Sequence, residues 1–128
     1  MMNRNPRDTY LAATVSTASP AQLLVMLFER LSLDLHRAVD ALDSGARDGA
    51  HQHLLHAQDI VVELRATLKV DAWDGGPALA SLYDYLLTEL ITANVNKDRD
   101  LAQACLTTVD ELRDVWREAA MSLISASA

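Results

Sequence analysis

Three histidines close together in the sequence are the residues best suited to bind a metal ion. His51, His53 and His56 lie within one short polar stretch, where Gln52 or Asp59 could complete a ligand set. On a helix, residues three positions apart share a face, so His53 and His56 lie side by side while His51 and His53 do not. The polar setting favours the solvated opening turns of a helix. We therefore predict no metal site and no cofactor.

Other residues with reactive side chains lack the neighbours that catalysis requires. Cys105 falls on an apolar helical seam and has no evident base beside it, so it is predicted to pack as a small core residue. Ser32 and Ser81 have no glycine-rich turn, and residues 75–77 lack the Lys and Ser/Thr of a phosphate-binding loop. No Glu is followed by His three residues later, which excludes the usual di-iron motif of helical bundles. We predict that the protein is not an enzyme.

The elements that carry these residues are predicted to be four helices, because apolar residues recur at steps of three and four. Ser19 can cap the first helix, with Pro20 at its first position and Gln22 completing a capping box. Gly45 suits a left-handed cap at its end. The predicted helices span residues 20–43, 47–70, 76–95 and 98–121.

Short connections make consecutive helices antiparallel neighbours, so the predicted fold class is an all-α, antiparallel up-down four-helix bundle. A polar stretch with a few apolar residues precedes it, and small residues follow it. The expected organisation is an N-terminal leader at 1–18, the bundle at 19–122 and a C-terminal tail at 123–128.

Size and composition fit one folded domain. The chain has 128 residues, of which 50% are hydrophobic and 23% charged, with a formal net charge of −7. This charge repels phosphate backbones and anionic lipids, so nucleic acid and membrane insertion are not expected. The longest apolar run, at 23–28, is far shorter than the roughly 20 residues of a membrane span. With a single cysteine and no signal-peptide pattern, the protein is expected to be cytoplasmic.

The predicted first and third helices carry more apolar residues than one buried stripe needs. Two interpretations remain open: tightly buried helices in an irregular bundle, or an apolar groove that accepts a partner helix. Apolar residues in the leader support the second slightly, because they must pack somewhere. The surplus residues are Leu23, Met26 and Phe28 in the first helix, and Leu79, Leu82, Tyr83, Tyr85, Leu86, Leu87, Leu90 and Ile91 in the third.

Several short motifs occur in an order that resembles the flagellar secretion chaperone family FliS. The chain shows Tyr10, then Val15–Pro20 and Leu23–Glu29, which is similar to the opening of that family. It departs from the usual pattern at Arg30-Leu31 and Thr88-Glu89. The resemblance covers about residues 10 to 119, and its later motifs are Ala57–Leu64, Gly75-Gly76 before Leu82–Tyr85, Ala93-Asn94 with Asp98, and Leu112–Trp116.

The resemblance implies a cytoplasmic chaperone that binds the disordered C-terminal segment of flagellin. Holding this segment as amphipathic helices would prevent premature polymerisation and keep flagellin competent for export. Components of the export apparatus are further candidate partners, and the chaperone is expected to be a monomer or weak homodimer. The partner-binding residues implied are Tyr10, Leu11, Val15, Leu82, Tyr83, Leu86, Ile91 and Asn94.

In that family the N-terminal segment is thought to cover part of the groove when no client is bound. Tyr10, Leu11 and Val15 match that place here. The leader could only occlude the groove, or Tyr10 could also contact the client. A helical adaptor or dimerisation module is the alternative function, and a histidine-based metal-binding bundle is a weaker one.

Overall fold

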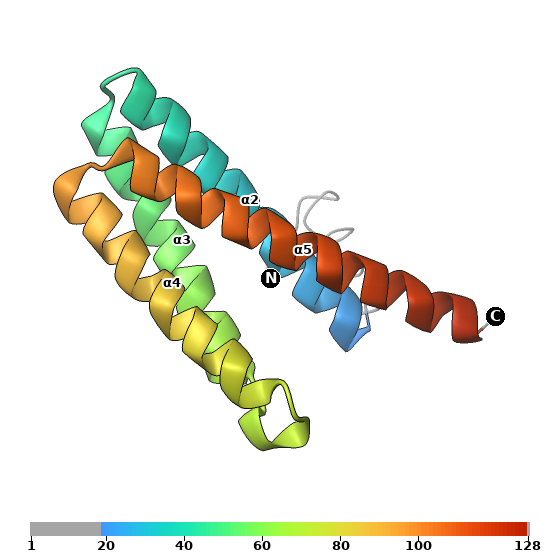
Figure 1. Ribbon diagram of the computed structural model, residues 1–128. Helices are drawn as coiled ribbons and strands as arrows, with labels where there is room; N and C mark the ends of the chain where they lie inside the picture. Colours follow the sequence, from blue (N-terminus) through green and yellow to red (C-terminus); the bar gives the residue numbers. More distant parts are fainter. Residues whose placement is uncertain (1–18, 128) are drawn as a thin grey trace, which may run out of the picture.

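The computed structural model describes residues 19–127, with side chains as far as residue 122. Within this range there are four long helices and no strand, which confirms the predicted fold class (Figure 1). The elements are α2 (Pro20–Asp43), α3 (Arg47–Thr67), the short 3-10 helix η1 (Val70–Ala72), α4 (Gly76–Asn96) and α5 (Arg99–Ser127).

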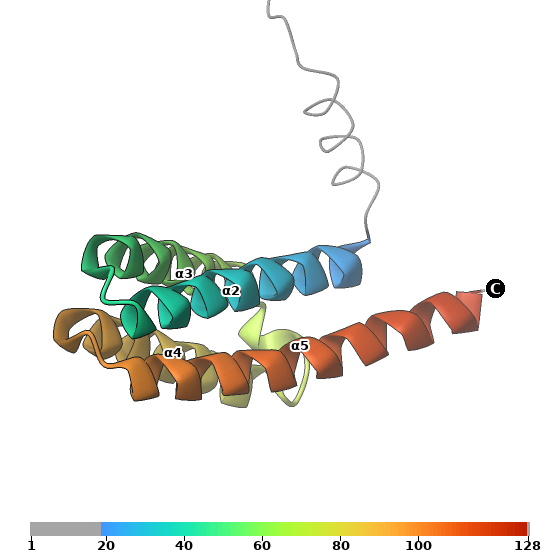
Figure 2. The ribbon, with the colours of Figure 1, turned by 90° about the horizontal axis from the view of Figure 1, so that it is seen from above.

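Each helix packs against its neighbours in the chain, and α5 returns to pack against α2. The four helices therefore enclose one core. Figure 2 shows two layers, with α2 and α3 in one and α4 and α5 in the other. The helices are not parallel throughout, because α2 and α5 diverge from α3 and α4 toward the end of the bundle that carries η1 (Figure 1).

Local signals in the sequence account for the helix boundaries. Ser19 Oγ accepts a hydrogen bond from the Gln22 backbone N–H (3.2 Å), and Gln22 Oε1 accepts one from the Ser19 backbone N–H (2.8 Å). This is the predicted capping box. Gly45 has a φ of 77°, the left-handed conformation expected after the end of α2. Asp98 Oδ1 accepts from the Leu101 N–H (3.1 Å) and so caps the start of α5.

Two of the predicted helix ends are wrong. The helix predicted to reach residue 70 ends at Thr67, because Leu68 turns to an extended conformation that leads into η1. The helix predicted to end at residue 121 continues to Ser127, so most of the expected tail at 123–128 is helical. No Gly or Pro interrupts this stretch, and nothing local stops the helix.

The core is narrowest at the end of the bundle opposite η1, where small side chains are buried between the helices. At the end where α2 joins α3 and α4 joins α5, fully buried alanines let the backbones approach closely: Ala38, Ala50, Ala93 and Ala102. At the opposite end two aromatic rings are buried, with Phe28 packed against Tyr83 at 6.4 Å between ring centroids. These rings take more room between the helices than the alanines do, and they lie where the helices diverge.

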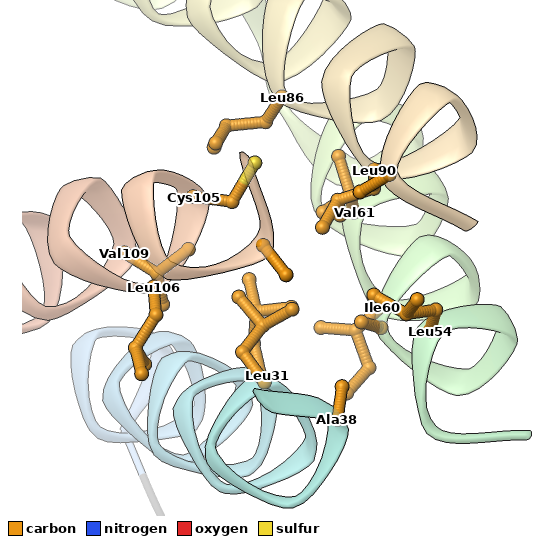
Figure 3. Close-up of a cluster of buried hydrophobic side chains, with 14 of the residues drawn as sticks. Leu31, Ala38, Leu54, Ile60, Val61, Leu86, Leu90, Cys105, Leu106 and Val109 are labelled. Carbon is orange, nitrogen blue, oxygen red and sulfur yellow. The ribbon is translucent and has the colours of Figure 1, made fainter. Parts of the chain in front are cut away.

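The middle of the core is aliphatic and draws on all four helices. Cys105 lies among these side chains and is buried, as predicted (Figure 3). Burial and the charge of Glu89 raise the pKa of its thiol to about 11, so the reactive thiolate is disfavoured. The residues labelled in Figure 3 are Leu31, Ala38, Leu54, Ile60, Val61, Leu86, Leu90, Cys105, Leu106 and Val109.

One charged side chain is fully buried in the bundle. Asp34 on α2 forms an ion pair with Arg30 one turn earlier (3.2 Å) and a hydrogen bond with His56 Nδ1 on α3. A buried carboxylate requires such partners because it has lost its hydration. The Asp34–His56 contact therefore joins α2 to α3 at a defined register.

Polar side chains also join α2 to α5 along their length. Ser32 Oγ donates to Asp110 Oδ1 (2.5 Å), and Arg113 contacts the same carboxylate oxygen (3.2 Å). Ion pairs extend this row toward both ends of α2: Glu29–Arg117 (2.9 Å) and Asp43–Arg99 (2.9 Å).

Replacing His56 by Ala tests the role of the buried ion pair. The substitution leaves Asp34 with Arg30 alone, so we expect the free energy of unfolding to fall by about 2 kcal/mol in urea titrations. His53→Ala is the matched control, because His53 makes no hydrogen bond within residues 19–122, and it should change stability by less than about 0.5 kcal/mol. Equal losses for both variants would mean that the Asp34–His56 contact adds nothing specific.

Candidate partner-binding groove

The divergence of the helices leaves an apolar groove at the η1 end of the bundle, with a cavity volume of about 700 Å³. Its walls come from the first half of α2, the end of α3, η1, the start of α4 and one residue of α5. The lining residues are Pro20, Leu23, Leu24, Met26, Leu27, Glu63, Leu64, Thr67, Leu68, Lys69, Ala72, Trp73, Leu79, Tyr83 and Trp116.

The floor of the groove consists of Leu64, Leu79 and Tyr83, which are buried and belong to the core cluster. Phe28 packs against Tyr83 behind this floor and separates the groove from the rest of the core. Because core residues form it, the floor is held in place by the packing of the whole bundle.

The chemistry of the groove suits apolar side chains. Glu63 and Lys69 are the only charged residues among those that line it. Leucines and aromatic rings make up most of the rest, with Met26 on the edge of α2 37% exposed. Concave apolar surfaces of this kind bind the apolar face of an amphipathic helix. The groove has no paired acid and base and no cluster of metal ligands among its lining residues.

The histidines considered as metal ligands face different helices. His51 Nδ1 lies within hydrogen-bond distance of the Asn94 side-chain amide on α4 (3.0 Å to Nδ2), whereas His56 contacts Asp34 on α2. In the part of the chain that the structure describes, no three His, Cys, Asp or Glu side chains gather to hold a metal ion.

The residues predicted from the sequence to bind a partner do not all meet at this groove. Tyr83 forms part of its floor. Leu82 is partly buried against the core, and Ile91 is 44% exposed further along α4. The leader residues Tyr10, Leu11 and Val15 lie outside the described residues.

Leu86 and Asn94 are both buried, and neither is in the groove. Leu86 packs in the core, among the side chains shown in Figure 3. Asn94 lies at the opposite end of α4 from the groove, where it bonds His51 and accepts from Lys97 Nζ at 2.5 Å. Neither residue lines the groove in this structure.

Most residues of the groove walls are not among those predicted to bind a partner. Leu23 and Met26, which line the groove on α2, belong to the apolar surplus of the first predicted helix. That surplus indicates the α2 wall from the sequence alone. Trp73 and Trp116 belong to a loop and to the last helix, and no local pattern relates them.

Comparison with known proteins agrees with this architecture. The family model described as flagellar protein FliS matches residues 2–123. The chain belongs to the FliS family. The flagellar secretion chaperone FliS of Bacillus subtilis is 28% identical over 122 residues, which cover 95% of this chain and 91% of that protein. The FliS of Salmonella typhimurium is 30% identical over 110 residues, covering 83% of this chain and 80% of its own.

A solved structure shares the fold of this FliS-family chain. It is described as the crystal structure of a flagellar chaperone from bacteria, and it superposes with a TM-score of 0.75 at 19% identity. The match covers 91% of this chain and 99% of that one. None of the helices within residues 19–127 is both long enough and apolar enough to cross a membrane.

The buried phenol at the groove floor provides a test of the packing there. Burial raises the pKa of Tyr83 to about 12, whereas an unfolded tyrosine ionises near 10. The folded state therefore keeps a proton that the unfolded state loses. The contribution of Tyr83 to the free energy of unfolding should be complete below about pH 10. It should then fall by about 2 kcal/mol between about pH 10 and 12.

Urea titrations at pH 8 and near pH 11.5 measure this loss. Tyr83→Phe has no phenol to ionise, so its stability should fall less than that of the wild type over this interval. Tyr85→Phe is the matched control because Tyr85 is 58% exposed, and it should behave like the wild type. An equal fall for wild type and Tyr83→Phe would assign the alkaline transition to another group, such as Cys105.

Proposed function

We propose that this FliS-family protein is a cytoplasmic export chaperone that binds the C-terminal segment of a flagellin in the apolar groove. The observation that carries the proposal is the groove itself, about 700 Å³ of apolar space on a chain with a net charge of −7. The names of the relatives, flagellar secretion chaperones, support the same client class.

Apolar burial supplies the attraction in this proposal. A segment that is disordered alone must lose conformational freedom when it becomes helical, and the cost reduces its affinity. Leu24 and Leu27 on one wall and Leu68 on the other offer aliphatic surface to the apolar stripe of such a helix. Each 100 Å² of apolar surface removed from water contributes about 2.5 kcal/mol before these costs.

Covering that stripe accounts for the chaperone effect. An amphipathic segment whose apolar face lies in the groove cannot pack against other flagellin molecules, so polymerisation is delayed. The client stays otherwise unfolded and therefore ready for export. The negative charge of the chaperone keeps both the free protein and the complex soluble.

The surface of α4 offers a second place for the same client. Ile91 is exposed and lies eight positions after Tyr83, which corresponds to about 12 Å along the helix. Leu82 directly precedes Tyr83 and is partly buried. A segment longer than the groove could continue onto α4, where Leu82 and Ile91 remain proposed contacts.

The leader is proposed to occupy the groove until the client displaces it. It is joined to α2 directly before Pro20, and Pro20 lines the groove. Tyr10, Leu11 and Val15 are therefore within ten residues of the groove edge along the chain. Ten extended residues span up to about 35 Å, which is ample to return across the opening.

Calorimetric titration with a synthetic peptide of the flagellin C-terminal segment tests the proposed function. We expect 1:1 binding with a large negative heat-capacity change, because folding and apolar burial are coupled. The peptide should gain helical circular dichroism on binding. Absence of binding at tens of micromolar protein would contradict the proposal.

A matched pair of variants places the binding site. Met26→Glu puts a charge on the groove wall and should weaken binding by at least about 10-fold, since a buried unpaired charge is costly. Val115→Glu puts the same charge on an exposed residue outside the groove, and affinity should not change. If Met26→Glu instead left the affinity for the peptide unchanged, the client would bind outside the groove.

Deleting residues 1–15 tests the role of the leader. If the leader covers the groove nine-tenths of the time, its removal should tighten peptide binding by about 10-fold and increase self-association. Tyr10→Ala distinguishes a leader that only occludes the groove from one that also contacts the client. This substitution should weaken binding only if Tyr10 touches the client. Equal affinities for the full chain, the deletion and Tyr10→Ala would mean that the leader is inert.

A further inference from the structure

Trp73 and Trp116, the two tryptophans of the chain, form the outer end of the groove. Their ring centroids are 6.3 Å apart and their planes meet at 78°, an edge-to-face contact. Trp73 follows η1 and Trp116 belongs to α5, so the pair bridges two parts of the bundle that diverge here. Trp73 is nevertheless 48% exposed, which leaves part of its ring open to a partner.

The backbone around Trp73 is fixed against the start of α4. A Cβ atom on Gly76 would lie 2.0 Å from the carbonyl oxygen of Val70, so only glycine permits η1 to pack this closely. The Gly76 N–H also donates a hydrogen bond to the Trp73 carbonyl (3.1 Å). The turn that presents Trp73 is therefore held in one place.

The ring of Trp73 is positioned by the absence of a side chain at Gly75. A Cβ atom there would lie 2.0 Å from Cζ3 and 2.4 Å from Cη2 of the indole. The ring lies across this glycine and reaches Trp116. A side chain at position 75 would therefore displace the indole ring, while the φ of −81° is open to any residue.

A large aromatic side chain that is rigid, half-exposed and beside an apolar groove has the properties of a binding hot spot. Its ring offers a wide contact area, and little side-chain freedom remains to be lost on binding. An aliphatic side chain entering the groove from this end would meet the open part of the Trp73 ring.

We propose that Trp73 is a partner-binding residue that fixes the position of the bound helix along the groove, by packing against an aliphatic side chain of the flagellin segment. This inference rests on the function proposed above. Trp116 acts as a positioning residue, because its edge-to-face contact supports the Trp73 ring.

Three variants test the proposal by titration with a labelled, tryptophan-free flagellin C-terminal peptide. Trp73→Ala removes the ring, and Gly75→Ala keeps the ring but displaces it from its place. Both should weaken binding by about 30-fold, the usual size of a hot-spot truncation. Gly49→Ala is the matched control: its Cβ would have no neighbour nearer than 3.9 Å, and affinity should equal that of the wild type.

Fluorescence gives an independent measurement that leaves the turn intact. In Trp116→Phe, Trp73 is the sole tryptophan and its emission reports its own surroundings. Saturating peptide should shift this emission to the blue and protect it from iodide quenching. This measurement does not depend on Gly75→Ala, so it remains valid even if circular dichroism shows that Gly75→Ala is unfolded.

The outcomes separate this inference from the function on which it rests. Wild-type affinity in both Trp73→Ala and Gly75→Ala, or an unchanged Trp73 emission at saturation, would overturn the role of Trp73 and leave the proposed function standing. Failure of the wild type and Gly49→Ala to bind the peptide would overturn both.

Discussion

The size gradient along the core is the constraint on which the rest of the structure depends. Alanines such as Ala38 and Ala93 bring the helices together at one end, while Phe28 and Tyr83 hold them apart near the other. No Pro or Gly lies inside α2 or α5 to kink either helix back toward its neighbours. The gap that remains at the wide end is the groove.

Polar contacts link the helices that stay together as the bundle widens. The contacts of Ser32 and Arg113 with Asp110 keep α5 against α2, and Arg65 pairs with Asp84 (3.1 Å) between α3 and α4. The bundle therefore opens between two stable helix pairs. Such a preformed opening reduces the ordering cost on the chaperone's side of a complex, which leaves that cost mainly with the client.

Two aromatic pairs of different character border the groove. Phe28 and Tyr83 are buried at and behind its floor and belong to the core, so they cannot move without loss of stability. Trp73 and Trp116 line its edge, where the glycines at 75 and 76 leave room for the Trp73 ring and for the close approach of η1. The floor is therefore fixed by the core, whereas the edge is formed by a half-exposed ring.

The sequence by itself determined the four helices and most of their ends, because hydrophobic period, capping residues and turn residues act between near neighbours in the chain. It also predicted the bundle, the burial of Cys105 and, through the surplus on the first helix, one wall of the groove. Only the tertiary structure decided how the surplus apolar residues of α4 divide between core and surface, with Tyr83 buried but Tyr85 and Ile91 exposed. A helix that is apolar on several sides carries no local sign of which surplus residues its neighbours will cover. Leu86 and Asn94, expected from the sequence to bind a partner, are buried, and Trp73 and Trp116, 43 positions apart, were not connected until the fold brought them together.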